Sequence, residues 1–304
     1  MTDQPLVSVV IIFWNAAPFL REAIESVRAQ SYPCRELLLV DDGSSDGSTS
    51  IARQYAADDP GQVRYLDHAG HANLGMSASR NLGIRHAQGS YIAFLDADDM
   101  WFSSALEDQV AILRAHPKAA MVYGPIQWWH SWSGKPEDRQ RDQVEHLGVP
   151  ADTLIDPPRL LPLFLRDKAA VPSGLLVRRD VVQSVGGFED AFCGEYEDQV
   201  FCAKVCLEAP VFAAGKCWYR YRQHADSCVL RGQQTGATHA ARLRFLNWLA
   251  GYLTERKVRD RAVWRALELE LWRFRHPRRY LWLRRSENFL GRMQRLLLPS
   301  GRGP

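Results

Sequence analysis

The sequence lacks several features that would define a protein class at once. None of its 304 residues lies in an apolar run approaching 18 residues, the length that a membrane-spanning helix needs. Six cysteines occur without a Cys-x-x-Cys pair, which argues against a zinc ribbon and, in a chain of this length, against a disulfide framework. No basic stretch precedes an apolar segment near the start, so we expect no cleaved secretory signal. These absences predict a cytoplasmic protein in a reducing compartment.

Charge is unevenly distributed along the chain. Residues 240–304 hold 16 Arg and Lys against 5 Asp and Glu, whereas the remainder is acidic although the whole chain has a net charge of +3. Tryptophans are interspersed with arginines in this basic segment, a combination found in helices that lie on anionic membranes. The alternative is that its helices pack on the rest of the protein with the arginines in water, and both interpretations stay open. Nucleic acid is not an expected partner, because no known binding module accompanies the charge.

Strand and helix patterns alternate over the first 125 residues, which predicts an α/β fold. Expected strands are continuous apolar runs at residues 7–13, 36–40, 63–66, 91–95 and 119–123. Expected helices cover residues 17–30, a segment after Ser48, and residues 72–87 and 103–115. This order indicates a mostly parallel sheet flanked by helices, with ligands beyond the carboxyl ends of the strands.

The pattern changes after residue 125. We expect loops from 125 to 172 with one short helix at 160–165, a region that contains Trp128, Trp129 and Trp132. Further strands are expected at 174–177, 211–212 and 217–221, and a helix at 195–207. After Gly236 the pattern is helical to the end, with one apolar stripe at Trp264, Leu267, Leu271 and Phe274 and another between residues 289 and 297.

Three acidic clusters are candidates for chemistry. Residues 41–47 read as a turn with a helix cap, and an EF-hand calcium loop does not fit their register. Residues 94–99, Phe-Leu-Asp-Ala-Asp-Asp, place three carboxylates after an apolar strand; such a group either caps an exposed turn or binds a cation such as Mg²⁺ or Mn²⁺. Residues 194–199, taken alone, read as an acidic helix N-terminus.

Taken together, these clusters carry a family resemblance. Residues 7–15 (Val-Ser-Val-Val-Ile-Ile-Phe-Trp-Asn), 36–44, 78–84 and 89–99 follow one another in an order that strongly resembles family 2 of the glycosyltransferases, which have the GT-A fold. The resemblance is close over residues 6–125, looser to about residue 230, and absent from 235–304. It implies a GT-A Rossmann-like domain with a C-terminal helical extension.

The resemblance also implies roles in binding a nucleoside diphosphate sugar. Trp14 stands where the family has Tyr and would stack on the nucleobase, and Asp41 would contact the base. Arg80, in an Ala-Arg-Asn-like segment, would lie near the nucleotide, and Asp96 would bind the ribose.

The remaining implied roles concern the metal and the acceptor. Asp98 would bind the Mn²⁺ or Mg²⁺ that bridges the diphosphate. His224 would be a further metal ligand, although a lone histidine is more often structural. Asp198, from a Glu-Asp pair, would be the catalytic base that deprotonates an acceptor hydroxyl.

We therefore expect a metal-dependent inverting glycosyltransferase that moves one sugar, with UDP as the default nucleotide, to a cell-surface glycan or lipid-linked acceptor. The Gln-x-x-Arg-Trp motif of the family's processive synthases is absent. A non-catalytic binding or scaffold protein on the same fold is the rival. Nucleotidyltransferases generally have a Gly-rich phosphate loop near the N-terminus, and none precedes residue 40.

The expected organisation has three parts. Residues 1–125 would be the nucleotide-sugar-binding half, and residues 126–234 the acceptor-binding half with the catalytic base. Residues 235–304 would be the basic helical tail, docked on the cytoplasmic face of a membrane or packed on the catalytic body.

Overall fold

The computed structural model describes residues 4–225, 227, 230, 232 and 236–280. The chain forms two compact units that divide between Thr238 and His239, and each is described by itself.

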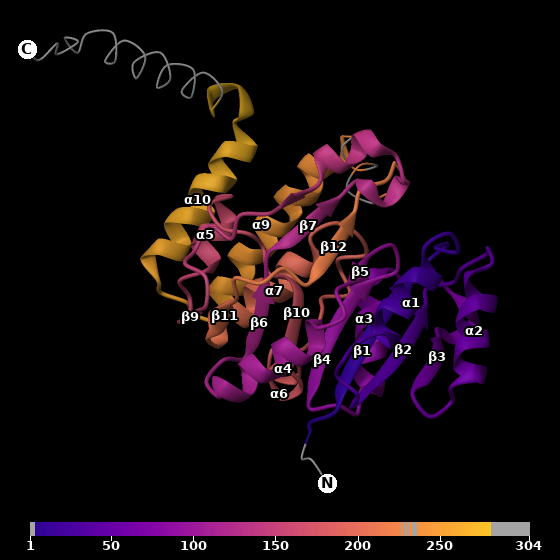
Figure 1. Cartoon of the computed structure of the whole chain (residues 1–304). Coiled ribbons are helices and arrows are strands. Elements are labelled where there is room, and N and C mark those ends of the chain that lie inside the picture. Colours follow the sequence, from indigo (N-terminus) through magenta and orange to yellow (C-terminus); the bar gives the residue numbers. More distant parts are fainter. Residues whose placement is uncertain (1–3, 226, 228–229, 231, 233–235, 281–304) are drawn as a thin grey trace, which may run out of the picture. The chain divides into compact units, whose positions relative to one another are not determined.

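An eight-stranded sheet is the centre of the first unit (Figure 1). Its strands lie in the order β3-β2-β1-β4-β10-β6-β11-β9. The first four are parallel, β10 is antiparallel to both of its neighbours, β11 is parallel to β6, and β9 is antiparallel to β11. This arrangement confirms the expected α/β, mostly parallel sheet. The strands are β1 (Val7–Phe13), β2 (Arg35–Asp41), β3 (Val63–Asp67), β4 (Tyr91–Asp96), β6 (Met121–Gly124), β9 (Thr153–Ile155), β10 (Ser173–Arg178) and β11 (Val211–Ala213).

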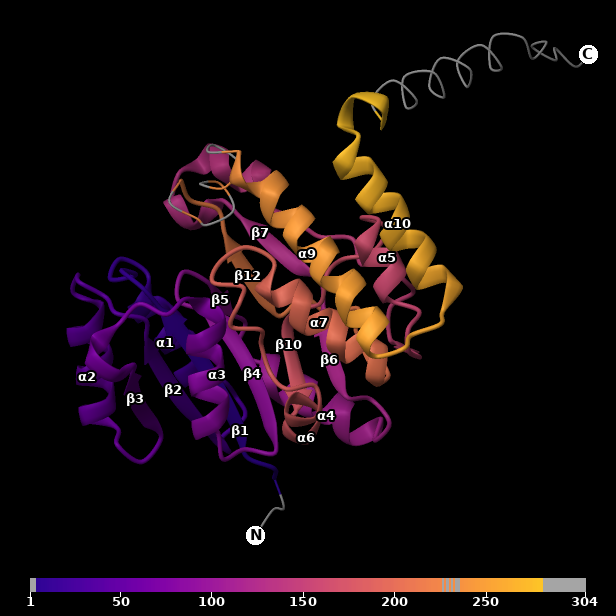
Figure 2. The same ribbon diagram turned by 180° about the vertical axis from the view of Figure 1, so that it is seen from behind.

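Helices cover both faces of this sheet, as Figures 1 and 2 show from opposite sides. Because side chains alternate along a strand, β1 contributes to both layers. Val9 and Ile11 belong to one buried cluster with Ile24 of α1 and Leu106 of α4. On the other face, the helix α3 approaches β1 closely at Gly83. The helices are α1 (Leu20–Arg28), α2 (Ser48–Asp58), α3 (Met76–His86), α4 (Ala105–Ala115), α5 (Leu161–Leu165), α6 (Arg179–Ser184) and α7 (Glu197–Glu208).

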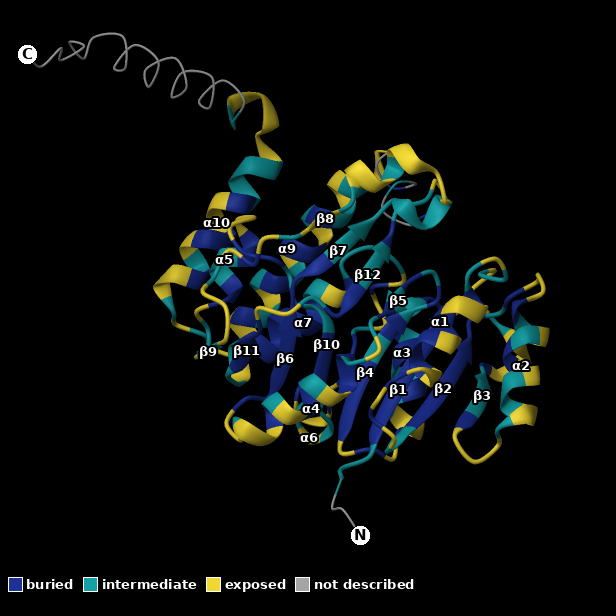
Figure 3. Ribbon diagram, viewed as in Figure 1, coloured by how far each residue is buried: buried dark blue, intermediate teal, exposed yellow. Residues whose placement is uncertain are grey.

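Burial follows this layering. The strands at the centre of the sheet are buried along most of their length (Figure 3), and every residue of β1 is buried. Hydrophobic burial on both faces explains why these strands appear in the sequence as continuous apolar runs.

A second, four-stranded sheet has the order β5-β12-β7-β8. It comprises β5 (Met100–Trp101), β7 (Ile126–Trp129), β8 (Gln143–Val144) and β12 (Tyr219–Arg222). Three 3₁₀ turns accompany the strands: η1 (Ala69–His71), η2 (Ser131–Ser133) and η3 (Pro136–Arg141). The expectation of loops with one short helix over 125–172 was therefore wrong in part, because β7, β8 and β9 lie in this region. The expected short helix is confirmed as α5.

The second unit contains α9 (Ala237–Glu255), which begins just before it, and α10 (Arg261–Arg275). Asp260 caps α10, accepting a hydrogen bond from the backbone N–H of Val263 at 2.9 Å. The expected stripe along α10 is inward-facing in part, with Leu267 fully buried. The expected stripe between residues 289 and 297 lies outside the described residues. Within the described ranges, no helix combines the length and apolar character that crossing a bilayer requires.

Candidate active site

The loops after β1 and β2 are held together by side chains from both. The backbone N–H of Asn15 donates to the Ser44 hydroxyl at 3.0 Å, and the Asn15 side-chain oxygen accepts from the N–H of Ser45 at 2.8 Å. Asn15 has a φ of 51°, a left-handed conformation that asparagine tolerates better than most residues. This linkage leaves the preceding Trp14 52% exposed, so its indole is available for stacking.

Asp41, at the end of β2, has no exposed surface. Its carboxylate accepts hydrogen bonds from the Ser44 N–H at 2.8 Å, the Thr49 hydroxyl at 2.5 Å and the Tyr65 hydroxyl at 3.2 Å. These bonds fix the turn between β2 and α2. The predicted contact of Asp41 with a nucleobase stays a prediction.

Arg80, on α3, joins two acidic motifs that are far apart in sequence. Its Nη2 lies 2.7 Å from Oδ1 of Asp96, and its Nη1 lies 2.7 Å from Oε1 of Glu197, 117 residues away. The side chains of Arg80 and Glu197 are each 7% exposed, whereas that of Asp96 is 42% exposed. The guanidinium also lies over the Phe188 ring at 5.3 Å. Arg80 thus brings the end of β4 next to the start of α7, where Asp198 lies.

One guanidinium serves several carboxylates here, and their pKa values respond. Burial raises the pKa of Glu197 to about 8, with Arg80 opposing the shift and Asp198 and Asp96 adding to it. Asp198 lies on the exposed side of α7, yet the surrounding protein desolvates its carboxyl group and raises its pKa. Asp198 accepts a hydrogen bond from the Gln199 N–H at 2.7 Å. A carboxylate with raised pKa and access to solvent is suited to accept a proton.

Asp98 and His224 also come together, from segments 126 residues apart. The His224 Nε2 lies 2.9 Å from Oδ2 of Asp98, and the side chains are 8% and 31% exposed respectively. The other ring nitrogen of His224, Nδ1, is buried without a hydrogen-bond partner. Within the part of the chain that the structure describes, no group of three His, Cys, Asp or Glu side chains forms a metal site. The pair can therefore supply at most two protein ligands.

Asp99 anchors the turn after β4 that carries Asp98. It is fully buried, accepts from the Tyr219 hydroxyl at 2.6 Å and from the Arg222 N–H at 2.7 Å, and its burial raises its pKa well above the ordinary value. Arg222 completes the support, because its Nε donates to the Asp98 carbonyl at 2.6 Å. Its guanidinium is stacked against Phe19, Trp129 and Trp132, at 4.9, 4.6 and 5.1 Å respectively.

The structure thus brings the predicted residues Arg80, Asp96 and Asp198 into one neighbourhood and pairs Asp98 with His224. Sequence reasoning missed the roles of Glu197 and Asp99, although each directly adjoins a residue that it identified. It also missed Arg222, which lies two residues before the predicted ligand His224.

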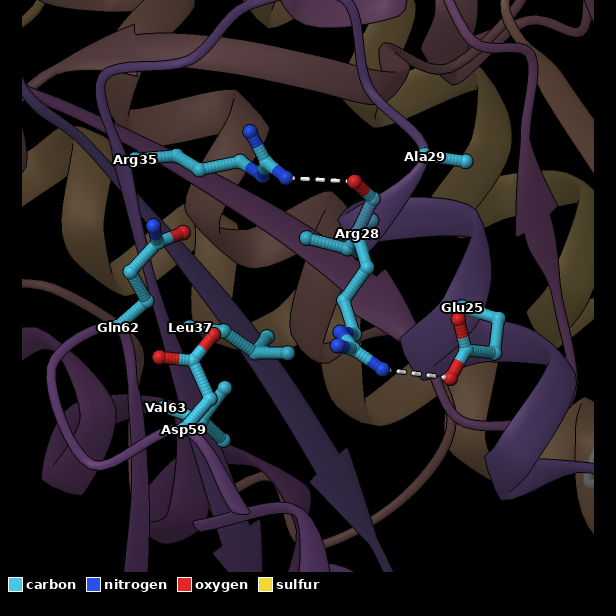
Figure 4. Close-up of a pocket in the computed structure, with 9 residues that line it drawn as sticks. Glu25, Arg28, Ala29, Arg35, Leu37, Asp59, Gln62 and Val63 are labelled. Atoms are coloured by element: carbon cyan, nitrogen blue, oxygen red, sulfur yellow. Dashed lines mark hydrogen bonds and ion pairs between the residues drawn. The ribbon is translucent and has the colours of Figure 1, made fainter.

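An open pocket of about 400 Å³ lies elsewhere, at the amino ends of β2 and β3 (Figure 4). Arg35, Asp59 and Gln62 line it, and Arg35 donates to the carbonyl oxygen of Arg28 at 2.5 Å. Because the acidic motifs follow the carboxyl ends of parallel strands, this pocket is at the opposite edge of the sheet from the candidate site.

Comparison with known proteins identifies the class. The family model described as glycosyl transferase family 2 matches residues 8–184, more than half of the chain. The chain therefore belongs to glycosyl transferase family 2, which confirms the family predicted from its sequence and places it among the glycosyltransferases.

Individual relatives are similar over shorter stretches. The putative glycosyltransferase EpsE of Bacillus subtilis is 42% identical over 116 residues, covering 38% of this chain and 41% of that protein. The chain spans about two fifths of the length of the curated relatives that it matches first.

Solved structures confirm the GT-A fold. The Staphylococcus aureus TarS fragment 1–349, in complex with UDP-GlcNAc, has a TM-score of 0.57 at 17% identity and covers 79% of this chain and 66% of that one. The mannosyltransferase PcManGT from Pyrobaculum calidifontis, in complex with GDP-Man and Mn²⁺, has a TM-score of 0.57 at 20% identity and covers 89% and 70%.

Proposed function

We propose that this chain is a metal-dependent inverting glycosyltransferase that transfers one sugar from a nucleoside diphosphate sugar to an acceptor hydroxyl. The observation that carries the proposal is the double ion pair of Arg80. By binding Asp96 and Glu197 at once, Arg80 brings the predicted donor-binding motif beside the predicted base, Asp198. Transfer requires this proximity, because the acceptor oxygen must attack the sugar while the diphosphate leaves.

The residues present fit a divalent cation. Mg²⁺ and Mn²⁺ favour oxygen ligands, Mn²⁺ takes an imidazole more readily than Mg²⁺ does, and a protein commonly supplies only one or two carboxylates when the substrate's phosphates and waters complete the shell. Asp98 and His224 provide that small set, and the unpartnered Nδ1 of His224 leaves the imidazole free to adopt either tautomer. When bound, the cation would supply Lewis-acid stabilisation of the leaving diphosphate.

The chain's own groups have separate tasks in this proposal. Asp98 and His224 hold the cation, Asp96 contacts the donor, and Arg80 fixes the orientation of Asp96. Asp198 takes the proton from the acceptor hydroxyl as it attacks the anomeric carbon from the face opposite the diphosphate. A single displacement of this kind inverts the anomeric configuration and forms no covalent sugar–enzyme intermediate.

The nucleotide is proposed to be UDP, with Trp14 stacked on the base and Asp41 beside it. The neighbours with the same fold have been solved with UDP-GlcNAc and with GDP-Man and Mn²⁺, which supports a nucleoside diphosphate sugar as the donor class. Trp14, being half exposed at the end of β1, is positioned to offer a ring face to either base.

We place the acceptor on a cell-surface glycan or a lipid-linked carrier, with residues 240–304 contacting an anionic membrane. In the described part of this segment, Arg261, Arg265 and Arg275 of α10 are exposed, and Arg278 and Arg279 follow them. The arginine pair at 284–285 and Trp282 lie outside the described residues. Co-sedimentation with anionic vesicles tests the contact, and absence of binding would favour a tail that packs on the protein instead.

The function is tested by Asp198→Asn, the removal of the proposed base. We expect turnover of the donor to fall by about 100-fold or more, while donor affinity in the presence of Mn²⁺ changes little. Asp180→Asn is the matched control, because Asp180 is also exposed near a helix start and also accepts from the next backbone N–H, at 2.9 Å. A panel of nucleoside diphosphate sugars, with and without Mn²⁺, identifies the donor by thermal shift.

Two results would contradict the proposal. Full activity of the Asp198→Asn variant would assign the base elsewhere. The rival function, a binding protein on this fold, would be indicated if the wild type binds a nucleoside diphosphate sugar but transfers the sugar neither to any acceptor tested nor to water.

A further inference from the structure

One face of the small sheet is buried in the hydrophobic core at Ile126 and Tyr219 but only half-buried further along, at Trp128 and Tyr221. In the parallel pair of β12 and β7, Tyr219 lies opposite Ile126 and Tyr221 opposite Trp128, so these four side chains project from the same face. Tyr219 bonds to Asp99 on this face. The next residue along the face, Tyr221, therefore extends from the aspartate turn toward Trp128, whose ring it meets edge to face at 5.3 Å between centroids.

Trp128 differs from the two tryptophans near it. The indole N–H of Trp129 donates to Ser131, that of Trp132 donates to the Gln223 carbonyl, and both rings stack on Arg222. Their binding capacity is thus occupied by the fold. Within the described residues, the Trp128 indole N–H has no hydrogen-bond partner, and it is not sealed from solvent.

Like the indole N–H of Trp128, the hydroxyl of Tyr221 is available for hydrogen bonding. It has no partner among the described residues and is not enclosed, while its side chain is half-buried. Burial raises the pKa of Tyr221, and the negative charges of Asp99, Asp98, Asp96 and Asp198 raise it further, in that order. The phenol is therefore within electrostatic reach of these four carboxylates and stays protonated, able to donate a hydrogen bond.

We propose that Trp128 and Tyr221 form the acceptor subsite and that it takes a sugar ring. This inference rests on the proposed function and names the acceptor class as a carbohydrate. The C–H face of a pyranose is apolar and slightly positive, which suits an aromatic face, while its hydroxyls match one free indole N–H and one free phenol. Tyr221 donates to an acceptor oxygen and directs the neighbouring hydroxyl toward Asp198.

The geometry favours a sugar over an acyl chain or a peptide. An acyl chain would leave both polar groups unpaired, at a cost that a carbohydrate avoids. An aromatic pair with hydrogen-bonding groups at its edge suits a ring with an apolar face and polar substituents.

The test uses the full chain saturated with UDP and Mn²⁺, with methyl pyranosides of glucose, galactose, mannose and N-acetylglucosamine as probes. Titration is followed by saturation-transfer NMR. At least one glycoside should bind, with transfer strongest at its ring C–H protons. Trp128→Ala should weaken glycoside binding about tenfold, and Trp128→Phe should weaken it less. Tyr221→Phe should lower the turnover of sugar transfer more than it lowers the affinity for the glycoside. Val144→Ala is the control, since Val144 is exposed on the same sheet but pairs with Gln127, on the other face.

The outcomes separate this inference from the function on which it rests. If UDP and Mn²⁺ raise the melting temperature of the wild type but no glycoside binds, or Trp128→Ala binds it as tightly as the wild type, the subsite is refuted and the glycosyltransferase assignment survives. If neither the nucleotide nor its sugars bind or react, the proposed function itself fails. Equal losses of nucleotide affinity in Trp128→Ala and Tyr221→Phe would show a merely structural role and also overturn the inference.

Discussion

Replacing Arg80 by methionine should be the most informative single change in this protein. Methionine keeps the apolar stem of the arginine side chain but removes both ion pairs, which leaves Glu197, 7% exposed, without a cation. Breaking a buried ion pair by removing one partner costs about 3–5 kcal/mol, because the other charge is left uncompensated. Asp96, whose side chain is 42% exposed, contributes little to that cost, since water solvates it.

The loss should depend on pH. Burial already raises the pKa of Glu197 from 4.5 to about 8 with Arg80 present, and removing Arg80 raises it further. A carboxyl group with a raised folded-state pKa holds a proton that the unfolded chain has released, so its contribution to stability falls as pH rises through this window. The window extends to higher pH in the variant. Its deficit in the free energy of unfolding should therefore be small near about pH 6 and should grow by about 1.4 kcal/mol for each pH unit above the wild-type pKa, to about 1.4 kcal/mol near about pH 9.

Urea denaturation of the metal-free wild type and variant at the two pH values measures this difference. Arg85→Met is the control, because Arg85 is an exposed arginine on the same helix. Glu197→Gln combined with Arg80→Met should recover most of the loss at high pH, since no buried charge remains. A deficit that is below about 1 kcal/mol at high pH, or the same at both pH values, would refute the reasoning.

Two further predictions concern residues that support the site. Gly83→Ala should lower the free energy of unfolding by about 1–3 kcal/mol in urea denaturation, because a Cβ at Gly83 would lie 2.4 Å from Cγ1 of Val10; an unchanged midpoint would contradict the packing of α3 on β1. Arg222→Lys should weaken Mn²⁺ binding in calorimetry about tenfold, because lysine cannot both stack on three rings and donate to the Asp98 carbonyl; normal Mn²⁺ affinity with a normal melting temperature would show that Arg222 does not position Asp98.

The strands of the central sheet were predictable because a strand buried on both faces appears in the sequence as a continuous apolar run. β1 occupies the residues expected, 7–13, and β4 exceeds the expected 91–95 by one residue. The small sheet was not predictable for the opposite reason. β8 has two residues, both exposed, and β7 has four, too few for an alternating hydrophobic pattern to stand out in the sequence. β7 pairs with β12, far along the chain, and β8 pairs with β7, so tertiary pairing decides their conformation.

The candidate site divides in the same way. Carboxylates that directly follow apolar strands, such as Asp96, can be predicted to lie at the ligand site, because ligands of parallel sheets bind at that edge. The pairing of Arg80 with Glu197 could not be read, because 117 residues separate them and no local pattern links a residue inside one helix to the first residue of another. The family resemblance predicted only that Arg80 lies near the nucleotide. In the structure the Arg80 side chain is almost fully buried, and its guanidinium pairs with two carboxylates.

The ion pairs of Arg80 explain why a bound cation would be needed at this site. Among the described side chains, Arg80 forms ion pairs with Asp96 and Glu197 but with neither Asp98 nor Asp198, and the raised pKa values of Glu197 and Asp198 reflect burial together with neighbouring negative charge. A nucleoside diphosphate adds further negative charge, so it would be repelled from Asp96 and Asp98 unless a dication came with it. In a site built from arginines and lysines the protein would supply that charge itself. Among the described residues, Arg80 is already paired with Asp96 and Glu197 and Arg222 with Glu22, so under the proposed function the metal becomes a condition of donor binding as well as of catalysis.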